Sequence, residues 1–294
     1  MSESPDTLSA GANTGQQPAS TGEDWGWYLY GIIRADRQPD DSIDEPAEQE
    51  REKPIEVITQ GNVQAIVRRV PLAEFAPEAI QSHADDPAWL EEFARRHNEV
   101  ISALHARRTI VPAKFGAVYV SRDDIRAALE AEHDRLLAHL NAIDGCDEWG
   151  IRLYGDVALI QHQAEANHEG VRRLREELAL ATPGRAYFLR RKLDEERAAA
   201  SDGELDHLID HAYGHLMTHA IAGQISARIS GTRLAQQSGE TGVMRAAFLV
   251  RRENTDAFLA SVQALAESQP GLRCEYSGPW PAYSFAAEIE EAMR

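Results

Sequence analysis

Residues 86–120, DPAWLEEFARRHNEVISALHARRTIVPAKFGAVYV, decide the fold of this chain. Asp86 is a good helix cap, and Pro87 suits the first position of the helix that follows it. Apolar or weakly polar residues then recur at steps of three and four, which predicts one buried face: Leu90, Phe93, His97, Ile101 and Leu104. Arg107 and Arg108 suit the end of that helix, because positive side chains complement its exposed carbonyl groups.

Two β-rich pieces follow the helix, at 109–112 and 115–120. Pro112 cannot donate a backbone hydrogen bond, so we expect a sheet edge or a bulge there. Ser121 then caps a second helix with one apolar stripe, which ends at Gly145.

The chain before this stretch reads as strands. Residues 25–33 are apolar on both faces, which is typical of a central strand, and 55–59 with 63–70 predict a hairpin. A polar loop precedes the hairpin and a short helix at 71–80 follows it. We therefore predict an N-terminal α+β domain over 25–145.

The C-terminal part has a second order of elements. They are a strand at 148–154, helices over 157–221 with breaks at 182–184 and 201–203, strands at 225–234 and 244–251, a helix from Asn254 and a strand at 272–276. Strand, helix, strand, strand, helix, strand is the split βαβ order of ferredoxin-like domains. We predict such a domain over 146–277, with inserted helices at about 157–221, and hence an α+β protein of two domains.

Separated motifs carry a resemblance to a known family. RHNEVI at 96–101 and IVPAKFG at 110–116 resemble the central signature of the gas vesicle synthesis protein family GvpL/GvpF. YLYGI at 28–32 resembles its opening strand, and GPWPAYSF at 278–285 its closing motif, with Ala282 where the family usually has a second proline. The resemblance implies two α+β domains, the C-terminal one a modified ferredoxin-like fold.

It also implies a role. Proteins of this family are gas vesicle assembly factors, so we expect the chain to bind the hydrophobic shell protein and other gas vesicle accessory proteins. We expect it at the gas vesicle and in the cytoplasm, without enzymatic activity and without a cofactor. The resemblance leaves open the F or L type, the surface that binds the shell protein, retention on the mature vesicle and the oligomeric state.

The composition of the chain argues against nucleic acid and membranes as partners. The chain of 294 residues carries 48 acidic against 30 basic residues, a net charge of −18, which disfavours nucleic acid. No apolar run has membrane-spanning length, so we expect no membrane insertion. Residues 1–24 resemble neither a signal peptide nor an anchor and are expected to be disordered. Cys146 and Cys274 fit free thiols of a cytoplasmic protein.

The C-terminal tail, 278–294, contains prolines and three large aromatic residues, Trp280, Tyr283 and Phe285. A proline-stiffened strip loses little entropy on docking, and its rings supply the buried area. One interpretation is that the tail packs across the two domains and clamps them. The other is that its rings anchor a partner protein.

A row of histidines is the main chemical alternative. His207, His211, His215 and His219 follow one another at steps of four, and two such imidazoles can share one zinc ion. A metal-dependent enzyme or metal-binding protein built on this row is therefore the competing hypothesis. The row has no obvious third or fourth ligand, and Ala212 stands where the glutamate of zinc hydrolases would be, so we favour structural or interfacial histidines.

No other catalytic pattern is present in the sequence. There is no phosphate-binding glycine loop and no G-x-S-x-G turn, so we assign no catalytic residues and no cofactor-binding residues. His97 lies on the apolar stripe of its helix and is interpreted as a core histidine rather than a general base. Lys114 is interpreted as a surface or ion-pairing lysine.

Overall fold

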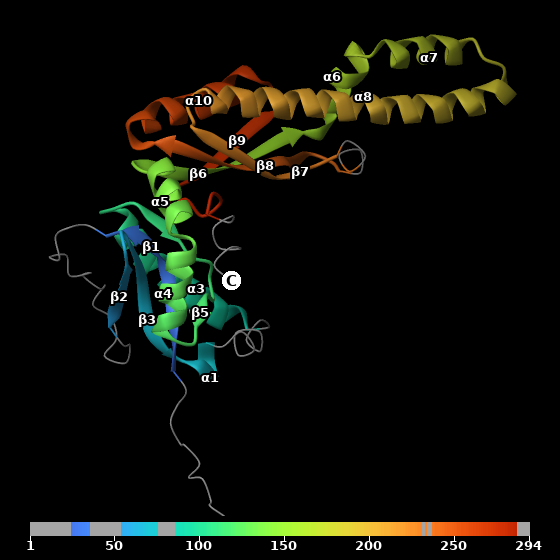
Figure 1. Ribbon diagram of the computed structural model, residues 1–294. Coiled ribbons are helices and arrows are strands. Elements are labelled where there is room, and N and C mark those ends of the chain that lie inside the picture. Colours follow the sequence, from blue (N-terminus) through green and yellow to red (C-terminus); the bar gives the residue numbers. More distant parts are fainter. Residues whose placement is uncertain (1–24, 36–53, 76–85, 231–232, 234–236, 287–294) are drawn as a thin grey trace, which may run out of the picture.

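The computed structural model of the protein describes residues 25–35, 54–75, 86–230, 233 and 237–286. The expected disordered tail at 1–24, most of the expected loop before the hairpin and the last eight residues lie outside these ranges. The described chain forms two antiparallel sheets, one in each half of the sequence, with helices packed on them (Figure 1). The predicted α+β class is confirmed.

The first sheet has strand order β2-β3-β1-β4, with β5 also paired to β1. Its strands are β1 (Trp25–Arg34), β2 (Ile55–Gln60), β3 (Val63–Pro71), β4 (Ile110–Pro112) and β5 (Val118–Tyr119). The central position predicted for residues 25–33 is confirmed, because β1 lies between β3 and β4. β4 forms the edge expected at Pro112.

The helices of this half are α1 (Leu72–Phe75), α3 (Pro87–His105), α4 (Arg122–Ala131) and α5 (His133–Ala142). Asp86 caps α3 as predicted, since its Oδ1 accepts hydrogen bonds from the backbone N–H groups of Ala88 and Trp89, both at 3.2 Å. The single helix expected after Ser121 is wrong. The chain breaks at Glu132, whose backbone leaves the helical region, and gives α4 and α5.

The strand predicted over 115–120 is also too long. Gly116 has a positive φ of 87°, a turn conformation that ends any strand there, so β5 keeps only two residues.

The second sheet has strand order β7-β8-β6-β9, and all of its neighbours are antiparallel. Its strands are β6 (Cys146–Asp156), β7 (Ala222–Arg228), β8 (Glu240–Arg251) and β9 (Leu272–Trp280). This arrangement is compatible with the predicted ferredoxin-like order. The helices are α6 (Val157–Asn167), α7 (Glu169–Ala179), α8 (Pro183–Met217) and α10 (Thr255–Ser268), with the 3₁₀ turn η1 (Arg252–Asn254).

Helices α8 and α10 cover one face of this sheet, and α5 lies against the other (Figure 1). Helix α8 continues far beyond the sheet and packs with α6 and α7 into a projecting arm (Figure 1). The break predicted at 201–203 is wrong, because α8 is one helix of 35 residues. Ala200, Ser201 and Leu205 are buried on either side of Gly203, so packing outweighs its weak helix propensity.

Two strand boundaries also differ from the predictions. The strand expected at 225–234 is β7, which begins three residues earlier and ends at Arg228. The last strand was predicted over 272–276, but β9 runs on to Trp280, which pairs with Glu148 after a register shift. Pro279 is tolerated because β9 is an edge strand.

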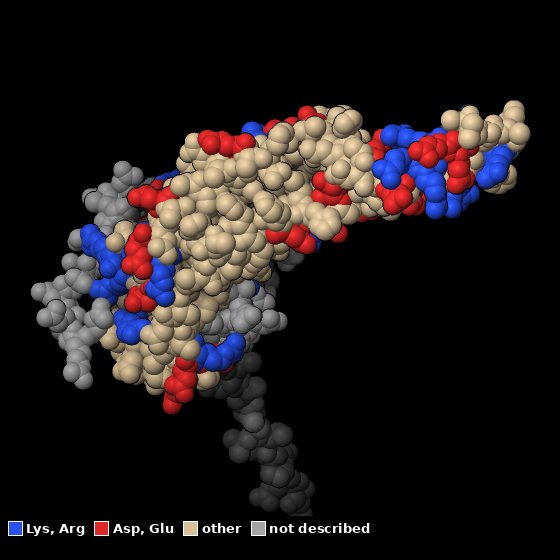
Figure 2. All heavy atoms as spheres, turned by 90° about the horizontal axis from the view of Figure 1, so that it is seen from above, with Lys and Arg blue, Asp and Glu red and all other residues tan. Residues whose placement is uncertain are grey.

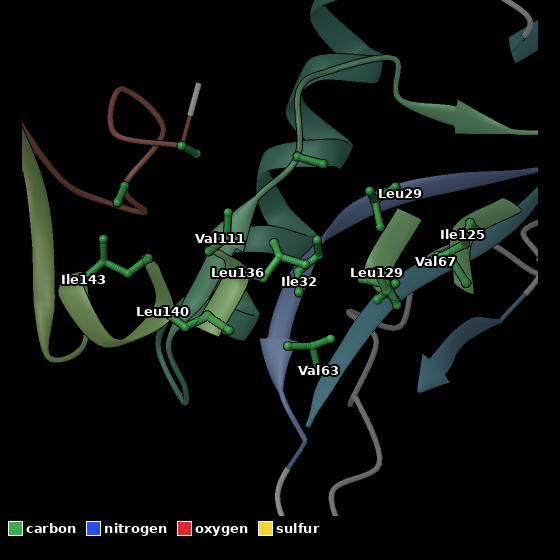
Figure 3. Close-up of a cluster of buried hydrophobic side chains, with 14 of the residues drawn as sticks. Leu29, Ile32, Val63, Val67, Val111, Ile125, Leu129, Leu136, Leu140 and Ile143 are labelled. Carbon is green, nitrogen blue, oxygen red and sulfur yellow. The ribbon is translucent and has the colours of Figure 1, made fainter. Parts of the chain in front are cut away.

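One of the two main hydrophobic cores joins the two halves of the chain. Leu29, Val67 and Leu129 of the first half pack in one buried cluster that also contains Leu249 of β8 and Ala282 of the closing segment. Figure 3 shows how side chains of β1, β3, β4, α4 and α5 meet in it. A second cluster lies between the second sheet and helices α8 and α10, and a small one holds the arm together.

Candidate functional site: a pocket where three motifs meet

A pocket of about 250 Å³ lies between α3, the turn after β4 and the closing segment. Its walls are Ala94, His97, Asn98, Pro112, Ala113, Lys114, Phe115 and Tyr283. The central signature supplies all of these residues except Ala94, which lies just before it, and Tyr283, which belongs to the closing motif. Tyr28, from the opening strand, lies directly behind His97. The three motifs are thus brought together in space.

The tyrosine–histidine pair behind the pocket is deeply buried. Tyr28 is 1% exposed, and its hydroxyl lies 2.8 Å from Nδ1 of His97 while accepting a hydrogen bond of 3.2 Å from the backbone N–H of Gly116. Burial lowers the pKa of His97 to about 4, with the backbone of Ala113 opposing part of the effect, so the ring is neutral at pH 7. In the neutral ring, Nδ1 is assigned as the acceptor of the hydrogen bond that the Tyr28 hydroxyl donates, and the ring hydrogen is on Nε2.

The second nitrogen of this ring is one of several buried histidine nitrogens without a partner in the described ranges. Among the described residues, Nε2 of His97 is buried and has no hydrogen-bond partner of good geometry. The ring stacks on Tyr30 at 5.9 Å and meets the edge of Phe115 at the same centroid distance. His97 is 3% exposed, so its interpretation as a core histidine is confirmed, and half of its hydrogen-bonding capacity is satisfied. Lys114 is exposed at the rim of the pocket.

The closing segment contacts both halves of the chain. The Tyr283 hydroxyl donates to Oδ1 of Asn98 on α3, with 2.8 Å between the oxygens. At the next position, the backbone N–H and the hydroxyl of Ser284 both donate to the carboxylate of Glu148 on β6, each at 2.7 Å. Phe285 packs against the core shared by the two halves, whereas Trp280 is 44% exposed. Two of the three predicted aromatic residues therefore face the protein itself.

Burial shapes the electrostatics of this contact. Glu148 is 7% exposed, and burial raises the pKa of its carboxyl, while the hydrogen bonds from Ser284 oppose the rise. Burial, followed by the nearby charge of Glu148, raises the pKa of Tyr283, so its phenol stays protonated and donates. Gly278 is required beside this site, because its φ is +140° and a Cβ there would lie 2.8 Å from the Glu148 carbonyl oxygen.

A second polar junction lies one residue away. The carboxylate of Asp147 lies 2.8 Å from Nε2 of His105, at the end of α3, and accepts a hydrogen bond of 2.9 Å from Nε of Arg252. Arg252 also donates to the backbone carbonyl of His105 at 3.0 Å. Burial alone would raise the pKa of Asp147, but the hydrogen bonds from His105 and Arg252 bring it below its ordinary value.

The histidine row lies elsewhere, on α8 and the turn after it. His207 and His211 are exposed, His215 and His219 are half-buried, and the rings of His211 and His215 stack at 6.4 Å. In the described part of the chain, no three side chains of His, Cys, Asp or Glu lie close enough together to hold an ion. The metal hypothesis therefore receives no support from the geometry.

Burial raises the pKa of both cysteine thiols, Cys146 and Cys274, and brings that of Cys274 to about 11.

A family model described as gas vesicle synthesis protein GvpL/GvpF matches residues 26–287. The chain belongs to the GvpL/GvpF family. The match includes both sheets, the arm and the closing segment, so the pocket lies within the family region. No helix in the described ranges of this GvpL/GvpF protein combines the length and the apolar character that a membrane span requires.

Relatives of both types are similar to this family member. Gas vesicle protein L of Streptomyces sp. (strain CB03234) is 32% identical over 265 residues, which cover 90% of this chain and 94% of the relative. Gas vesicle protein F of the same strain is 25% identical, over 88% of this chain and 98% of its own length. The crystal structure of GvpF from Microcystis aeruginosa has a TM-score of 0.61 at 17% identity, covering 89% of this chain and 98% of that one. It supports the fold.

The sequence alone did not reveal the junctions at Asp147 and Glu148. The one available signal was the placement of two consecutive acidic residues, Asp147 and Glu148, just before the apolar residues of a strand. Their partners lie 42 to 136 positions away, so no local spacing could identify them.

Proposed function

We propose that this GvpL/GvpF protein is a non-catalytic assembly factor, which binds the hydrophobic shell protein and other gas vesicle proteins during vesicle formation. The observation that carries the proposal is the family match over residues 26–287. Relatives that cover the same region are named gas vesicle proteins L and F. On this proposal the protein acts at the gas vesicle, within the cytoplasm.

The physical role follows from the chemistry of a shell subunit. A small protein that polymerises through apolar, β-rich surfaces must be kept from premature edge-to-edge pairing and delivered to the growing shell. An acidic, arginine-containing protein with exposed apolar side chains can hold such a subunit without changing any covalent bond. Trp280 is a candidate anchor because nearly half of it is exposed.

We also propose that the closing segment clamps two domains, one over 25–145 and one over 146–277. Two hydrogen-bonded contacts support this role, since Tyr283 binds Asn98 of the first region and Ser284 binds Glu148 of the second. The buried side chain of Ala282 adds apolar contact between them. A clamped pair of domains presents one rigid surface to a partner.

Gene deletion in a vesicle-forming host tests the assembly role. We expect cells that lack the gene to lose buoyancy and to regain it with the wild-type gene. A variant with both His211→Ala and His215→Ala should restore buoyancy as well as the wild type, because these side chains are exposed or half-buried and belong to no metal-binding group among the residues that the structure describes. Buoyant deletion cells would contradict the proposal, and failure of the histidine variant would revive the metal hypothesis.

A further inference from the structure

One stripe of side chains runs along the whole of α8 at steps of three and four. In the second half of the helix it is buried against the second sheet through Leu205, Ile209, Ala212 and Leu216. In the first half the same stripe continues as Tyr187, Arg191, Asp194 and Ala198, beyond the sheet. The face that holds α8 to the sheet therefore emerges into solvent along the arm.

The apolar core of the arm does not include this face. Its own small core is formed by other positions of α8, among them Leu189 and Leu193, which pack against Val171 and Leu174 of α7. Tyr187 is 68% exposed and the neighbouring Phe188 is 71% exposed, with their rings 5.6 Å apart in an edge-to-face contact. Leu180, in the turn before α8, is 89% exposed. Exposed apolar residues gathered in this way mark an interaction surface.

The charge of the arm differs from that of the chain. The whole chain carries −18, whereas residues 157–200, which form α6, α7 and the first half of α8, contain eight basic and seven acidic residues. The basic excess lies toward the tip of the arm, where residues 169–192 contain seven basic and three acidic residues. Figure 2 shows lysine and arginine side chains gathered on the far part of the arm, with some acidic side chains among them. Arg190 and Lys192 are exposed, and neither forms an ion pair with any residue that the structure describes. An aromatic pair beside arginines is typical of the centre of a protein interface.

We propose that the outer end of this exposed stripe, Tyr187 together with the adjacent ring of Phe188, docks a different gas vesicle polypeptide through a surface that is apolar at its centre and acidic around it. The proposal rests on the assembly function proposed above and names its contact surface. Along the buried half of α8 the second sheet covers the stripe, and along the arm the partner takes that place. Two copies of the arm carry the same charge, which opposes a symmetric contact between them.

Site-specific photo-crosslinking in vesicle-forming cells tests the surface. The full chain would carry p-benzoylphenylalanine at position 187, and a control chain would carry it at Val120, which is 72% exposed in the first half. We expect a light-dependent product at position 187 that joins the chain to another gas vesicle protein through a peptide containing aspartate or glutamate. No product, a product with a second copy of this chain, or the same product at position 120 would overturn the proposal.

Second-site variants test its two physical parts. Phe188→Ser and Arg190→Glu should each lower the crosslinking yield at position 187 by about tenfold, as expected when an interface anchor is removed. The matched controls Val120→Ser and Arg251→Glu, also at exposed positions, should leave it unchanged. Equal loss in the controls would overturn the proposal. Circular dichroism should show the same folded content in all four variants, because the side chains are exposed.

These experiments separate the two proposals. Suppose that gene deletion abolishes buoyancy, that the chain with Tyr187→Ser and Phe188→Ser restores normal vesicles, and that the separate chain with p-benzoylphenylalanine at position 187 forms no crosslink. The docking surface is then wrong and the assembly function stands. If deletion leaves vesicles intact, the assembly function itself is wrong.

Discussion

Asp147 and Glu148 are consecutive residues of β6, yet their carboxylates bind two segments that lie far apart in the sequence. Asp147 contacts His105 at the end of α3, and Glu148 accepts two hydrogen bonds from Ser284 in the closing segment. Successive side chains of a strand point to opposite sides, so one dipeptide can hold two distant segments. Both residues are buried, and each carboxylate is stabilised by its hydrogen bonds.

Glu148→Gln is expected to change how stability depends on pH. Because the folded-state pKa of Glu148 is raised above its ordinary value of 4.5, the folded chain holds this proton where the unfolded chain has lost it. The contribution of this group to stability therefore falls as the pH rises through that range. Glutamine does not ionise, so the variant lacks this loss. As the pH rises above 4.5, the free energy of unfolding of the variant should increase relative to that of the wild type. Urea denaturation between pH 4 and pH 8 measures the difference, and a constant difference would contradict the argument.

Asp147→Ala should destabilise the protein by about 2 kcal/mol, because it leaves the half-buried His105 and the Arg252 guanidinium without their shared acceptor. The pKa of Asp147 is lowered in the folded chain, so the wild-type contribution is present above 3.8 and is lost as the pH falls through the lowered value. Urea denaturation at pH 7 measures the loss. The control Asp123→Ala removes an exposed ion pair with Arg126 and should have little effect.

Replacement of His97 by glutamine should flatten the acid side of the stability profile. The pKa of His97 falls from 6.5 to about 4 on folding, so the unfolded chain binds a proton first, and stability is lost as the pH drops from 6.5 to about 4. The loss amounts to about 3 kcal/mol on the scale of pKa shifts. Denaturation at several pH values checks the slope, with His207→Gln, at an exposed position, as the control. Equal slopes in the wild type and His97→Gln would refute the prediction.

Two glycine substitutions should act in opposite directions. Gly203→Ala should stabilise the chain by about 0.5–1 kcal/mol, because Gly203 is inside α8 and a Cβ there meets nothing within 4 Å. Gly278→Ala should destabilise it by more than about 1 kcal/mol, because its φ is +140° and the Glu148 carbonyl is in the way. Thermal unfolding measures both. A loss of stability in Gly203→Ala would mean that the middle of α8 is not a regular helix.

Much of the fold could be predicted because its signals are local. Asp86 and Pro87 define the start of α3 through cap and backbone chemistry, and both act within one helical turn. The apolar residues of β1 predicted a central strand, since a strand covered on both faces is apolar on both faces. In the second half, the order of strands and helices along the chain predicted a sheet with helices packed on it.

The remaining features depend on contacts that spacing does not encode. Gly203 was expected to end a helix, but the burial of Ser201 and Leu205 on both sides of it keeps α8 continuous. The pocket unites residues of α3, the turn after β4 and the closing segment, of which Tyr283 and Asn98 lie 185 positions apart. The family resemblance indicated that these runs belong together, whereas their contacts are visible in the structure alone.

Helix α8 consists of 35 residues without interruption, and at the usual rise per residue it is about 52 Å long. A continuous helix has no hinge, so a force on the tip of the arm is not absorbed along the way. The outer end of α8 and its side chains that are buried against the second sheet therefore move together as one rigid rod. A pull on Tyr187 at the far end is therefore resisted by Leu205 and Ile209, which are buried against the second sheet.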